Sequence, residues 1–323
     1  MGIREFLGKE ILYFDGAMGT RLQEAGMKPG ELPEIWNITH PEVVTAIHAS
    51  YIKAGANILK SNTFGANRLK LEGSGYSVEA VVSAALKNAR DAWESVPVAA
   101  HGAAPGEAPD VTHRASHDVT SDVTQGMVSE VAPVKRFVSL DLGPTGKLLA
   151  PYGDLFFEEA VSLYAEMVRA GVKAGADLIL IETMSDTYEA KAAILAAKEN
   201  SDLPVFVTFT FDRDGNLLNG ASVETAMLLA DGLGVDAAGF NCGLGPDLVA
   251  GFIPRARAVT KLPLIANPNA GLPVEKAGKT VYTIAPYAFA AYMKEICRLG
   301  SSVLGGCCGT SPVSYTHLRA HET

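Results

Sequence analysis

Short apolar segments of strand length alternate along the chain with longer amphipathic segments of helix length, and the alternation repeats about eight times. Polar or turn-forming residues bound the apolar segments, as is usual for strands. The apolar segments lie at residues 11–14, 58–60, 137–140, 178–181, 205–211, 237–240, 264–266 and 302–304. Helical patterns lie between them, for example at residues 41–54, 78–93, 156–174 and 188–199. The pattern predicts an α/β protein.

The predicted strands are apolar without interruption, which favours a parallel sheet. A strand that is buried on both faces shows no alternation of polar and apolar residues, and this is typical of parallel sheets covered by helices. A series of eight strand–helix units predicts a (β/α)8 barrel, the TIM-barrel fold.

Polar residues follow each of the predicted strands. In chain order they are Asp15, Asn62, Asp141, Glu182, Thr210, Asn241 with Cys242, Asn267, and Cys307 with Cys308. Barrel enzymes carry their chemistry at the C-terminal ends of the strands, whereas an open doubly wound sheet concentrates its site at one switch point. The polar strand ends therefore favour the barrel and predict a site at this face.

Two segments depart from the pattern. Residues 97–133 are rich in Ala, Pro, Ser, Thr, Asp and Val, show no period, and are longer than an ordinary connection, so we expect a low-complexity surface insertion. Residues 313–323 show almost no apolar stripe where an eighth helix should lie, so we expect that helix to be truncated. We therefore assign residues 1–312 to the barrel and interpret residues 313–323 as an atypical tail, truncated or foreign.

Composition narrows the classes of partner and compartment. The 323 residues carry a net charge of −9 without a dense Lys/Arg cluster, which argues against a nucleic-acid partner. Four cysteines, two of them adjacent, are not a disulfide framework for a chain of this size and indicate a reducing compartment. No segment has the length of a membrane span, and residues 1–9 lack the apolar core of a signal peptide. We expect a cytoplasmic protein that binds small molecules or another protein.

Two adjacent cysteines stand between glycines in the sequence GGCCG at residues 305–309. Adjacent Cα atoms lie about 3.8 Å apart, whereas a disulfide normally needs more than about 4.4 Å, so Cys307 and Cys308 are expected to bind a metal or to be reactive thiols. Cys242, in the similar sequence GFNCG, is the best further ligand. Three thiolates with an open fourth position indicate catalytic zinc. Cys297, within an apolar helical pattern, is interpreted as a packing residue.

Carboxylates end two of the predicted strands. Asp15 begins a turn of small residues, DGAMGT, whose backbone N–H groups could meet a ligand, but the lysine of a phosphate-binding loop is missing and nucleotide binding is not expected. Asp15 and Glu182 together could hold an ammonium group; the alternative is that each pairs with a lysine or arginine. The turns at residues 143–146 and 268–271 are assigned to shaping the mouth of the site.

In this order, the fragments resemble the homocysteine S-methyltransferase family over nearly the whole barrel. The fragments are DGAMGT at 15–20, SNTFGAN at 61–67, GPTG at 143–146, ETMSD at 182–186, GFNCGLGP at 239–246, PNAGLP at 268–273 and GGCCGTSP at 305–312. Within the family, EIWNITHPEVV at 34–44 and PNAGLP most resemble the N-terminal homocysteine-binding module of cobalamin-dependent methionine synthase.

The resemblance implies a zinc site beside a site for the amino acid homocysteine. The expected zinc ligands, which also carry the catalysis, are Cys242, Cys307 and Cys308. The expected substrate contacts are Asp15, Gly16, Asn62, Glu182 and Asn241.

The expected reaction is transfer of a methyl group to the thiol of homocysteine, which gives methionine. Only the thiolate is a good nucleophile, and zinc would lower the pKa of the substrate thiol. The resemblance implies that methylcobalamin, methylated from methyltetrahydrofolate and carried by another module or protein, is the donor. S-methylmethionine or betaine is an alternative donor. A further alternative is a non-catalytic docking module braced by zinc, but structural zinc normally has four protein ligands and the sequence offers three.

Overall fold

The computed structural model describes residues 2–97, 135–276 and 279–320. The predicted insertion at residues 97–133 lies outside the described residues apart from Pro97, and so does the end of the predicted tail, residues 321–323.

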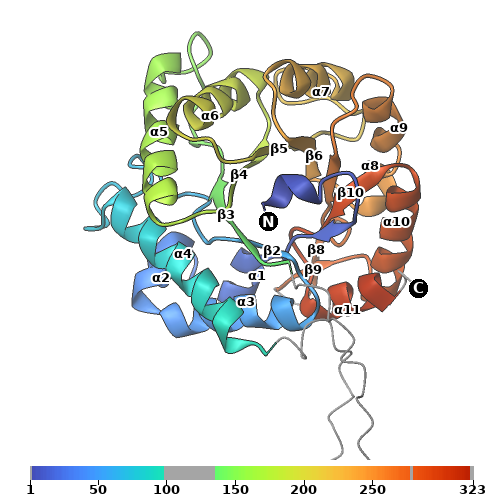
Figure 1. The fold of residues 1–323 in the computed structure, drawn as a ribbon, viewed down its shortest axis with the longest axis horizontal. Coiled ribbons are helices and arrows are strands. Elements are labelled where there is room, and N and C mark those ends of the chain that lie inside the picture. The colour runs from blue at the N-terminus through green and yellow to red at the C-terminus, as the bar shows by residue number, and fades with distance from the viewer. Residues whose placement is uncertain (1, 98–134, 277–278, 321–323) are drawn as a thin grey trace, which may run out of the picture.

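Eight parallel strands form one sheet that curves into a barrel (Figure 1). The strands follow one another around the sheet in the order β1-β10-β7-β6-β5-β4-β3-β2. Phe14, after β1, pairs with Ile58 at the start of β2, and the Asp15 N–H donates to the Ile58 carbonyl over 2.9 Å. These contacts join the two ends of the sheet, and the predicted (β/α)8 barrel is confirmed. The strands are β1 Leu12–Tyr13, β2 Ile58–Lys60, β3 Phe137–Leu142, β4 Leu178–Met184, β5 Val205–Phe209, β6 Ala237–Asn241, β7 Leu264–Asn267 and β10 Ser301–Leu304.

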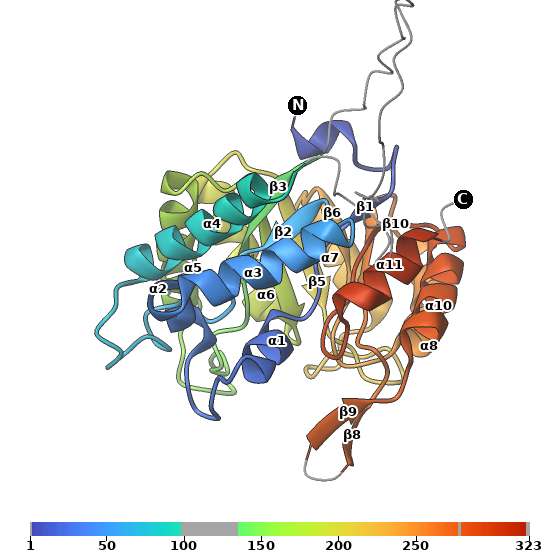
Figure 2. The same cartoon turned by 90° about the horizontal axis from the view of Figure 1, so that it is seen from below.

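Helices surround the sheet, as the amphipathic segments predicted (Figures 1 and 2). Three of them begin at a residue whose side chain accepts a backbone N–H of the first turn: Ser77 before α4, Asp186 before α6 and Ser222 before α7. Within the described residues, every helix is too short or too polar to cross a membrane. The helices are η1 Ile3–Glu5, α1 Met18–Glu24, η2 Pro33–Ile35, α2 Trp36–Thr39, α3 Pro41–Lys53, α4 Val78–Ser95, α5 Phe157–Lys173, α6 Thr187–Asn200, α7 Val223–Gly232, α8 Pro246–Val249, α9 Phe252–Arg257, α10 Pro286–Arg298 and α11 Pro312–Ala320.

The final helix, α11, packs against the barrel. Helix α11 is short, but it does have a buried stripe, because Tyr315 is 0 % exposed and Leu318 is 3 % exposed. The Tyr315 hydroxyl donates to the carbonyl of Asp15 over 2.8 Å, and its ring packs against Tyr51 on α3. Residues 313–323 were predicted to have almost no apolar stripe, and in the described part Tyr315 and Leu318 are the buried apolar side chains. The Arg319 guanidinium of the same helix also donates to the Gly55 carbonyl over 2.9 Å, so polar and apolar contacts together hold this helix on the barrel.

An antiparallel hairpin, β8 Pro273–Lys276 with β9 Lys279–Tyr282, was not predicted. Figure 2 shows it projecting from the body on the side away from the N-terminus, the side on which the strands end. Val274 and Val281 are both more than a third exposed, so the hairpin lacks the buried apolar pattern by which the other strands were found.

The other end of the barrel is closed by apolar side chains. Helix η1 lies across its centre in Figure 1, and Ile3 of that helix is buried in a cluster with Phe14 and Phe206 from the strands. The Phe14 and Phe206 rings meet edge to face at 6.3 Å. We call this apolar cluster the closed end, and the opposite face, where the strands finish, the mouth.

Candidate active site

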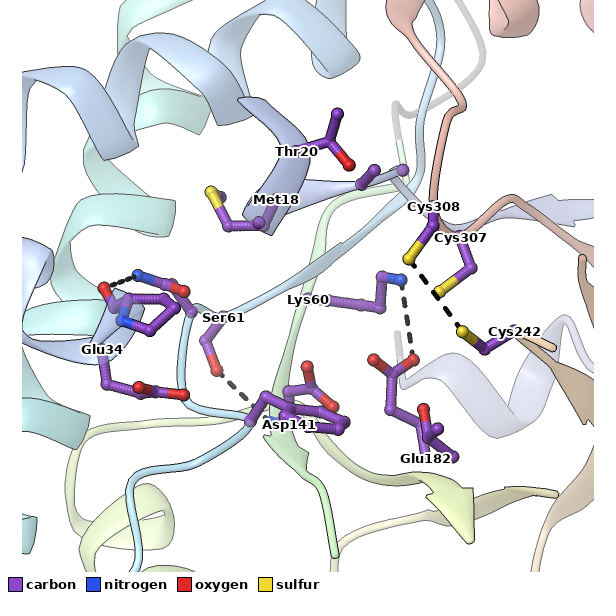
Figure 3. Close-up of a pocket in the computed structure, with 17 residues that line it drawn as sticks. Met18, Thr20, Glu34, Lys60, Ser61, Asp141, Glu182, Cys242, Cys307 and Cys308 are labelled. Atoms are coloured by element: carbon purple, nitrogen blue, oxygen red, sulfur yellow. Dashed lines mark hydrogen bonds and ion pairs between the residues drawn. The ribbon is translucent and has the colours of Figure 1, made fainter. Parts of the chain in front are cut away.

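A cavity of about 280 Å³ lies at the mouth, the face on which the sequence predicted the site. Cys242, Cys307 and Cys308 line one side of it, and Lys60 and Glu182 lie beside them (Figure 3). These residues belong to the ends of β2, β4, β6 and β10. The barrel thus brings together side chains that are far apart in the sequence.

The three cysteine sulfurs form a compact group. All three lie within 4.8 Å of one another, and the Sγ atoms of Cys242 and Cys308 are 4.0 Å apart. Sulfur ligands of a tetrahedral zinc ion, each about 2.3 Å from the metal, lie about 3.8 Å from one another. The thiols therefore fit a zinc ligand set with little rearrangement. Cys297 lies on α10, outside this group.

The backbone fixes the directions of these thiols. Cys242 has a φ of 56°, in the left-handed region, and its N–H donates to the carbonyl of Asn267 over 3.1 Å. Gly309, directly after the cysteine pair, has a φ of 79°, and a Cβ there would lie 2.2 Å from Cγ of Tyr282. Glycine is required at this position, because any side chain would collide with the hairpin residue that covers the thiols.

The thiols differ in their readiness to ionise. Hydrogen bonds from Cys242 and Cys307 hold the pKa of the Cys308 thiol well below its usual range. Hydrogen bonding to the other two sulfurs, together with burial, raises the pKa of Cys307 well above its usual range. One thiolate therefore forms readily, whereas a second and a third need a cation beside them. Thiolate is also the donor that selects zinc over magnesium or calcium.

Glu182 and Lys60 form a buried ion pair at the base of the cavity. The Lys60 Nζ lies 3.6 Å from Glu182 Oε2, and both side chains are 8 % exposed. Burial acts to lower the pKa of Lys60, but the neighbouring charges, Glu182 first, outweigh it and raise that pKa. Burial raises the pKa of Glu182, and Lys60 opposes this. Asp141, which also lines the cavity, has its pKa raised well above the usual range by burial and then by Glu182.

Asp15, the other predicted carboxylate, is buried but is not among the residues that line the cavity. Its Oδ1 accepts the backbone N–H of Lys60 over 3.1 Å, and its Oδ2 lies 3.3 Å from Nδ1 of His48. These contacts tie β1 to β2 and α3 behind the cavity. Glu182, in contrast, lines the cavity.

Gly16 and Asn62 line the cavity as expected of substrate contacts. A Cβ on Gly16 would lie 2.8 Å or less from Tyr51 and Thr310, so only glycine fits there. The Asn62 side chain donates to the carbonyl of Pro33 over 2.7 Å. Both residues therefore shape the wall through tight local packing.

Asn241 was predicted to contact substrate, but its side chain reaches past the end of β5 to Thr183 on β4. It is 1 % exposed, its Oδ1 accepts the N–H of Thr183 over 2.8 Å, and its Nδ2 donates to Thr183 Oγ1 over 2.6 Å. Asn241 is not among the residues that line the cavity, whereas Thr183 is.

Sequence reasoning missed the site roles of Lys60 and Glu34. Lys60 was counted as the last residue of an apolar strand, and a lysine ending such a strand was the available signal. Glu34, 5 % exposed, lines the cavity, and its Oε1 accepts the N–H of Gly65 over 2.6 Å. No spacing in the sequence connects it with the strand ends.

Comparison with known proteins gives the chain a family. The homocysteine S-methyltransferase family matches residues 12–321. The methionine synthases of Mycobacterium leprae and Mycobacterium tuberculosis are 31 % and 30 % identical to this chain over 98 % of its length. The alignment covers 24 % of each of them, so the chain spans about a quarter of the length of these relatives.

Solved structures support the fold. The metallated form of the homocysteine methyltransferase MmuM from Escherichia coli superposes with a TM-score of 0.73 at 22 % identity, covering 97 % of this chain and 96 % of that one. The oxidized form gives 0.74, also at 22 % identity, with 98 % of each chain covered. The barrel is thus shared with these proteins.

Proposed function

Because the chain belongs to the homocysteine S-methyltransferase family, we propose that it transfers a methyl group to the thiol of homocysteine and so forms methionine. The observation that carries the proposal is the cavity in which the thiols of Cys242, Cys307 and Cys308 face the buried carboxylate of Glu182. Homocysteine bears a thiol at one end and an ammonium group at the other, and the cavity offers a partner for each.

We propose that zinc binds to Cys242, Cys307 and Cys308. Among the His, Cys, Asp and Glu side chains of the described residues, the group that could hold a metal ion has these three members, and in this proposal the substrate thiol supplies the fourth ligand. When bound, the ion lowers the pKa of a thiol that occupies this position, so that the thiol reacts as a thiolate at neutral pH. This arrangement favours a catalytic site over a docking module braced by zinc.

The chain's own residues bind and orient the substrate in this proposal. The Glu182 carboxylate accepts hydrogen bonds from the substrate ammonium group, and its buried position strengthens this interaction because little water competes. Lys60 pairs with Glu182 and lines the same cavity, and in this proposal it also binds the substrate carboxylate. Asp15 holds the backbone of Lys60 and acts through it.

The methyl group leaves its donor without its bonding electrons, which remain with the donor, and the homocysteine sulfur supplies the pair for the new bond. We propose methylcobalamin, recharged from methyltetrahydrofolate on another module or protein, as the donor. The sequence resemblance to the homocysteine-binding module of cobalamin-dependent methionine synthase supports this choice. The similarity to methionine synthases about four times as long as the aligned region agrees with it.

An assay with separate donors tests the proposal. Zinc-loaded protein is offered homocysteine with methylcobalamin, S-methylmethionine or betaine, and methionine is measured. We expect methionine from methylcobalamin. If methionine forms only with S-methylmethionine or betaine, the proposed donor is wrong and the proposed methyl transfer to homocysteine stands. No methionine from any donor, with zinc bound, would contradict catalysis by this chain and favour the docking module.

A further inference from the structure

Strand β4 carries an irregularity where it reaches the cavity. Ile181 pairs with Val207 of β5, and Met184 pairs with Phe209. Between these two pairs, β4 therefore contains one residue more than β5. The extra residue marks a β-bulge, a feature that redirects side chains next to active sites. Thr183, within the bulge, has a φ of 63°. This left-handed conformation is a genuine outlier for a β-branched residue and must be held by its surroundings.

The bulge changes which side chains face the cavity. Successive residues of a regular strand point to opposite faces. Glu182 and Thr183 are adjacent, yet both line the cavity. The left-handed turn at Thr183 therefore decides where the Glu182 carboxylate lies relative to the thiols.

Asn241 is the residue that holds the bulge. It lies at the end of β6, beyond β5, and its side chain accepts from Thr183 N–H and donates to Thr183 Oγ1. Thr210, after β5, donates its hydroxyl to the Asn241 carbonyl over 2.6 Å and so fixes the backbone of Asn241 between the two strands. The next residue after Asn241 is Cys242. Two adjacent residues thus have separate roles: Cys242 contributes a thiol to the cluster, and Asn241 holds the strand that bears Glu182.

We propose that Asn241 is a positioning residue that sets the place of the Glu182 carboxylate relative to the thiol cluster, and that it thereby selects thiols that also carry an ammonium group. This inference rests on the proposed function. Asn241 touches neither sulfur nor ammonium of the substrate; it acts through Thr183. Loss of its two hydrogen bonds releases Thr183 toward an ordinary φ and withdraws Glu182 from its place.

Binding of two ligands separates this role from a merely structural one. The probes are homocysteine and 4-mercaptobutanoate, which keeps the thiol and carboxylate but has no ammonium group for Glu182. Their affinities for the zinc-loaded full chain are measured by calorimetry, with zinc content determined for each variant. In Asn241→Leu we expect affinity for homocysteine to fall by roughly tenfold or more, as for loss of a buried charged contact, and affinity for 4-mercaptobutanoate to stay unchanged.

Substitutions of Thr183 test the strain directly. Glycine adopts a φ of 63° without cost, so Thr183→Gly removes the backbone strain that Asn241 opposes. In that background Asn241→Leu should have a smaller effect than it has alone, because the strained residue is gone. The control is Asn57→Leu near the closed end, where Asn57 Oδ1 accepts the Tyr13 N–H. That variant should lose stability and keep the preference for homocysteine.

The preference for homocysteine over 4-mercaptobutanoate decides both proposals. If the original chain does not prefer homocysteine over 4-mercaptobutanoate, the proposed substrate fails and the inference with it. If the original chain shows the preference and Asn241→Leu keeps it in full, the inference alone is overturned. Should Asn241→Leu not fold, Thr183→Val decides, since it keeps the branched side chain and removes only the hydroxyl that Asn241 contacts. A loss of preference supports the inference, and an unchanged preference overturns it.

Discussion

The closed end and the mouth of the barrel are built from the same strands and follow opposite rules. At the closed end, Ile3, Phe14 and Phe206 are fully or nearly fully buried among apolar neighbours. At the mouth, Lys60 and Glu182 are almost as deeply buried, but they are charged. One end contributes burial of apolar surface, which stabilises the fold, whereas the other accepts buried charge, which costs free energy unless each group is paired.

Backbone conformation shows the same division. Within the described residues, the non-glycine residues with positive φ are Thr183 and Cys242, and both lie at the mouth. The mouth also holds buried polar atoms that lack a hydrogen bond within the described chain, on Asp141, Glu182 and Asn267, although such atoms occur in other parts of the fold as well. Such strain and incomplete pairing persist at functional sites when the rest of the fold is stable enough to hold them. The comparison predicts that substitutions at the mouth change function and those at the closed end change stability.

The largest expected effect breaks the mouth and leaves the closed end intact. In Cys308→Ser, we expect bound zinc to fall from one equivalent per chain to nearly none, because a hydroxyl is a poor replacement for a thiolate ligand. Methionine formation should fall by more than the roughly 10–100-fold loss that is typical when a residue hydrogen-bonded to a metal ligand is replaced. Metal analysis of the purified protein measures the first effect. Cys297→Ser is the matched control and should keep its zinc; unchanged zinc in Cys308→Ser would contradict the ligand set.

The reverse experiment breaks the closed end. Phe206→Ala removes a fully buried ring that meets Phe14 edge to face, and we expect it to lower the free energy of unfolding by about 3–5 kcal/mol. Denaturant unfolding measures the change. Zinc content below the transition should stay the same. Leu228→Ala on α7, where the side chain is 54 % exposed, should change stability by no more than about 0.5 kcal/mol. Loss of zinc in folded Phe206→Ala would show that the two ends are not independent.

A smaller effect on stability is expected from the hydrogen bond that joins α11 to the chain at Asp15. Tyr315→Phe removes the hydroxyl that donates to the Asp15 carbonyl and leaves a buried acceptor unpaired. We expect a loss of about 1–2 kcal/mol in the free energy of unfolding. Tyr292→Phe on α10, where the ring is 42 % exposed, is the control and should be neutral. Equal stability of the two variants would contradict a role for Tyr315 in holding α11.

The smallest effect is expected at an ion pair outside both ends. Arg255 on α9 donates to both carboxylate oxygens of Glu224 on α7, over 2.7 and 2.9 Å, and this lowers the pKa of Glu224 to about 2. The folded-state pKa is below the ordinary value, so the pair stabilises the fold at neutral pH and loses this contribution as pH falls toward 2. Because the pair is exposed, Glu224→Gln should cost less than about 1 kcal/mol at pH 7. The difference in unfolding free energy between the two proteins should be smaller at pH 3 than at pH 7; a constant difference would contradict the linkage.

Much of the fold was predictable because burial leaves a direct trace in the sequence. Strands buried on both faces must be apolar throughout, and this gave the parallel barrel from segments such as 178–181 and 237–240. Helix α11 left almost no trace, since its buried apolar side chains in the described part are Tyr315 and Leu318. The hairpin β8–β9 left none of this kind, because its valines are exposed.

The candidate site was predictable where chemistry restricts the residue type. Adjacent cysteines between glycines have few uses, and the structure does bring Cys307 and Cys308 to Cys242. The contact between Asn241 and Thr183 could not be predicted, because it depends on a bulge and on the reach of one side chain across β5. Residue type showed that Asn241 is at a strand end, and geometry was needed to show which way it points.

The pairing of β1 with β10 has a consequence for the order of folding. Leu12 lies beside Val303, so the sheet closes only after almost the whole described chain has come together. The thiol cluster joins residues 66 positions apart, Cys242 and Cys308, across the intervening strand β7. Contacts between such distant segments form late, because the chain loses much entropy before they are made. Assembly of the thiol cluster would then require β6, β7 and β10 to have paired, and metal binding would report that this part of the sheet has formed.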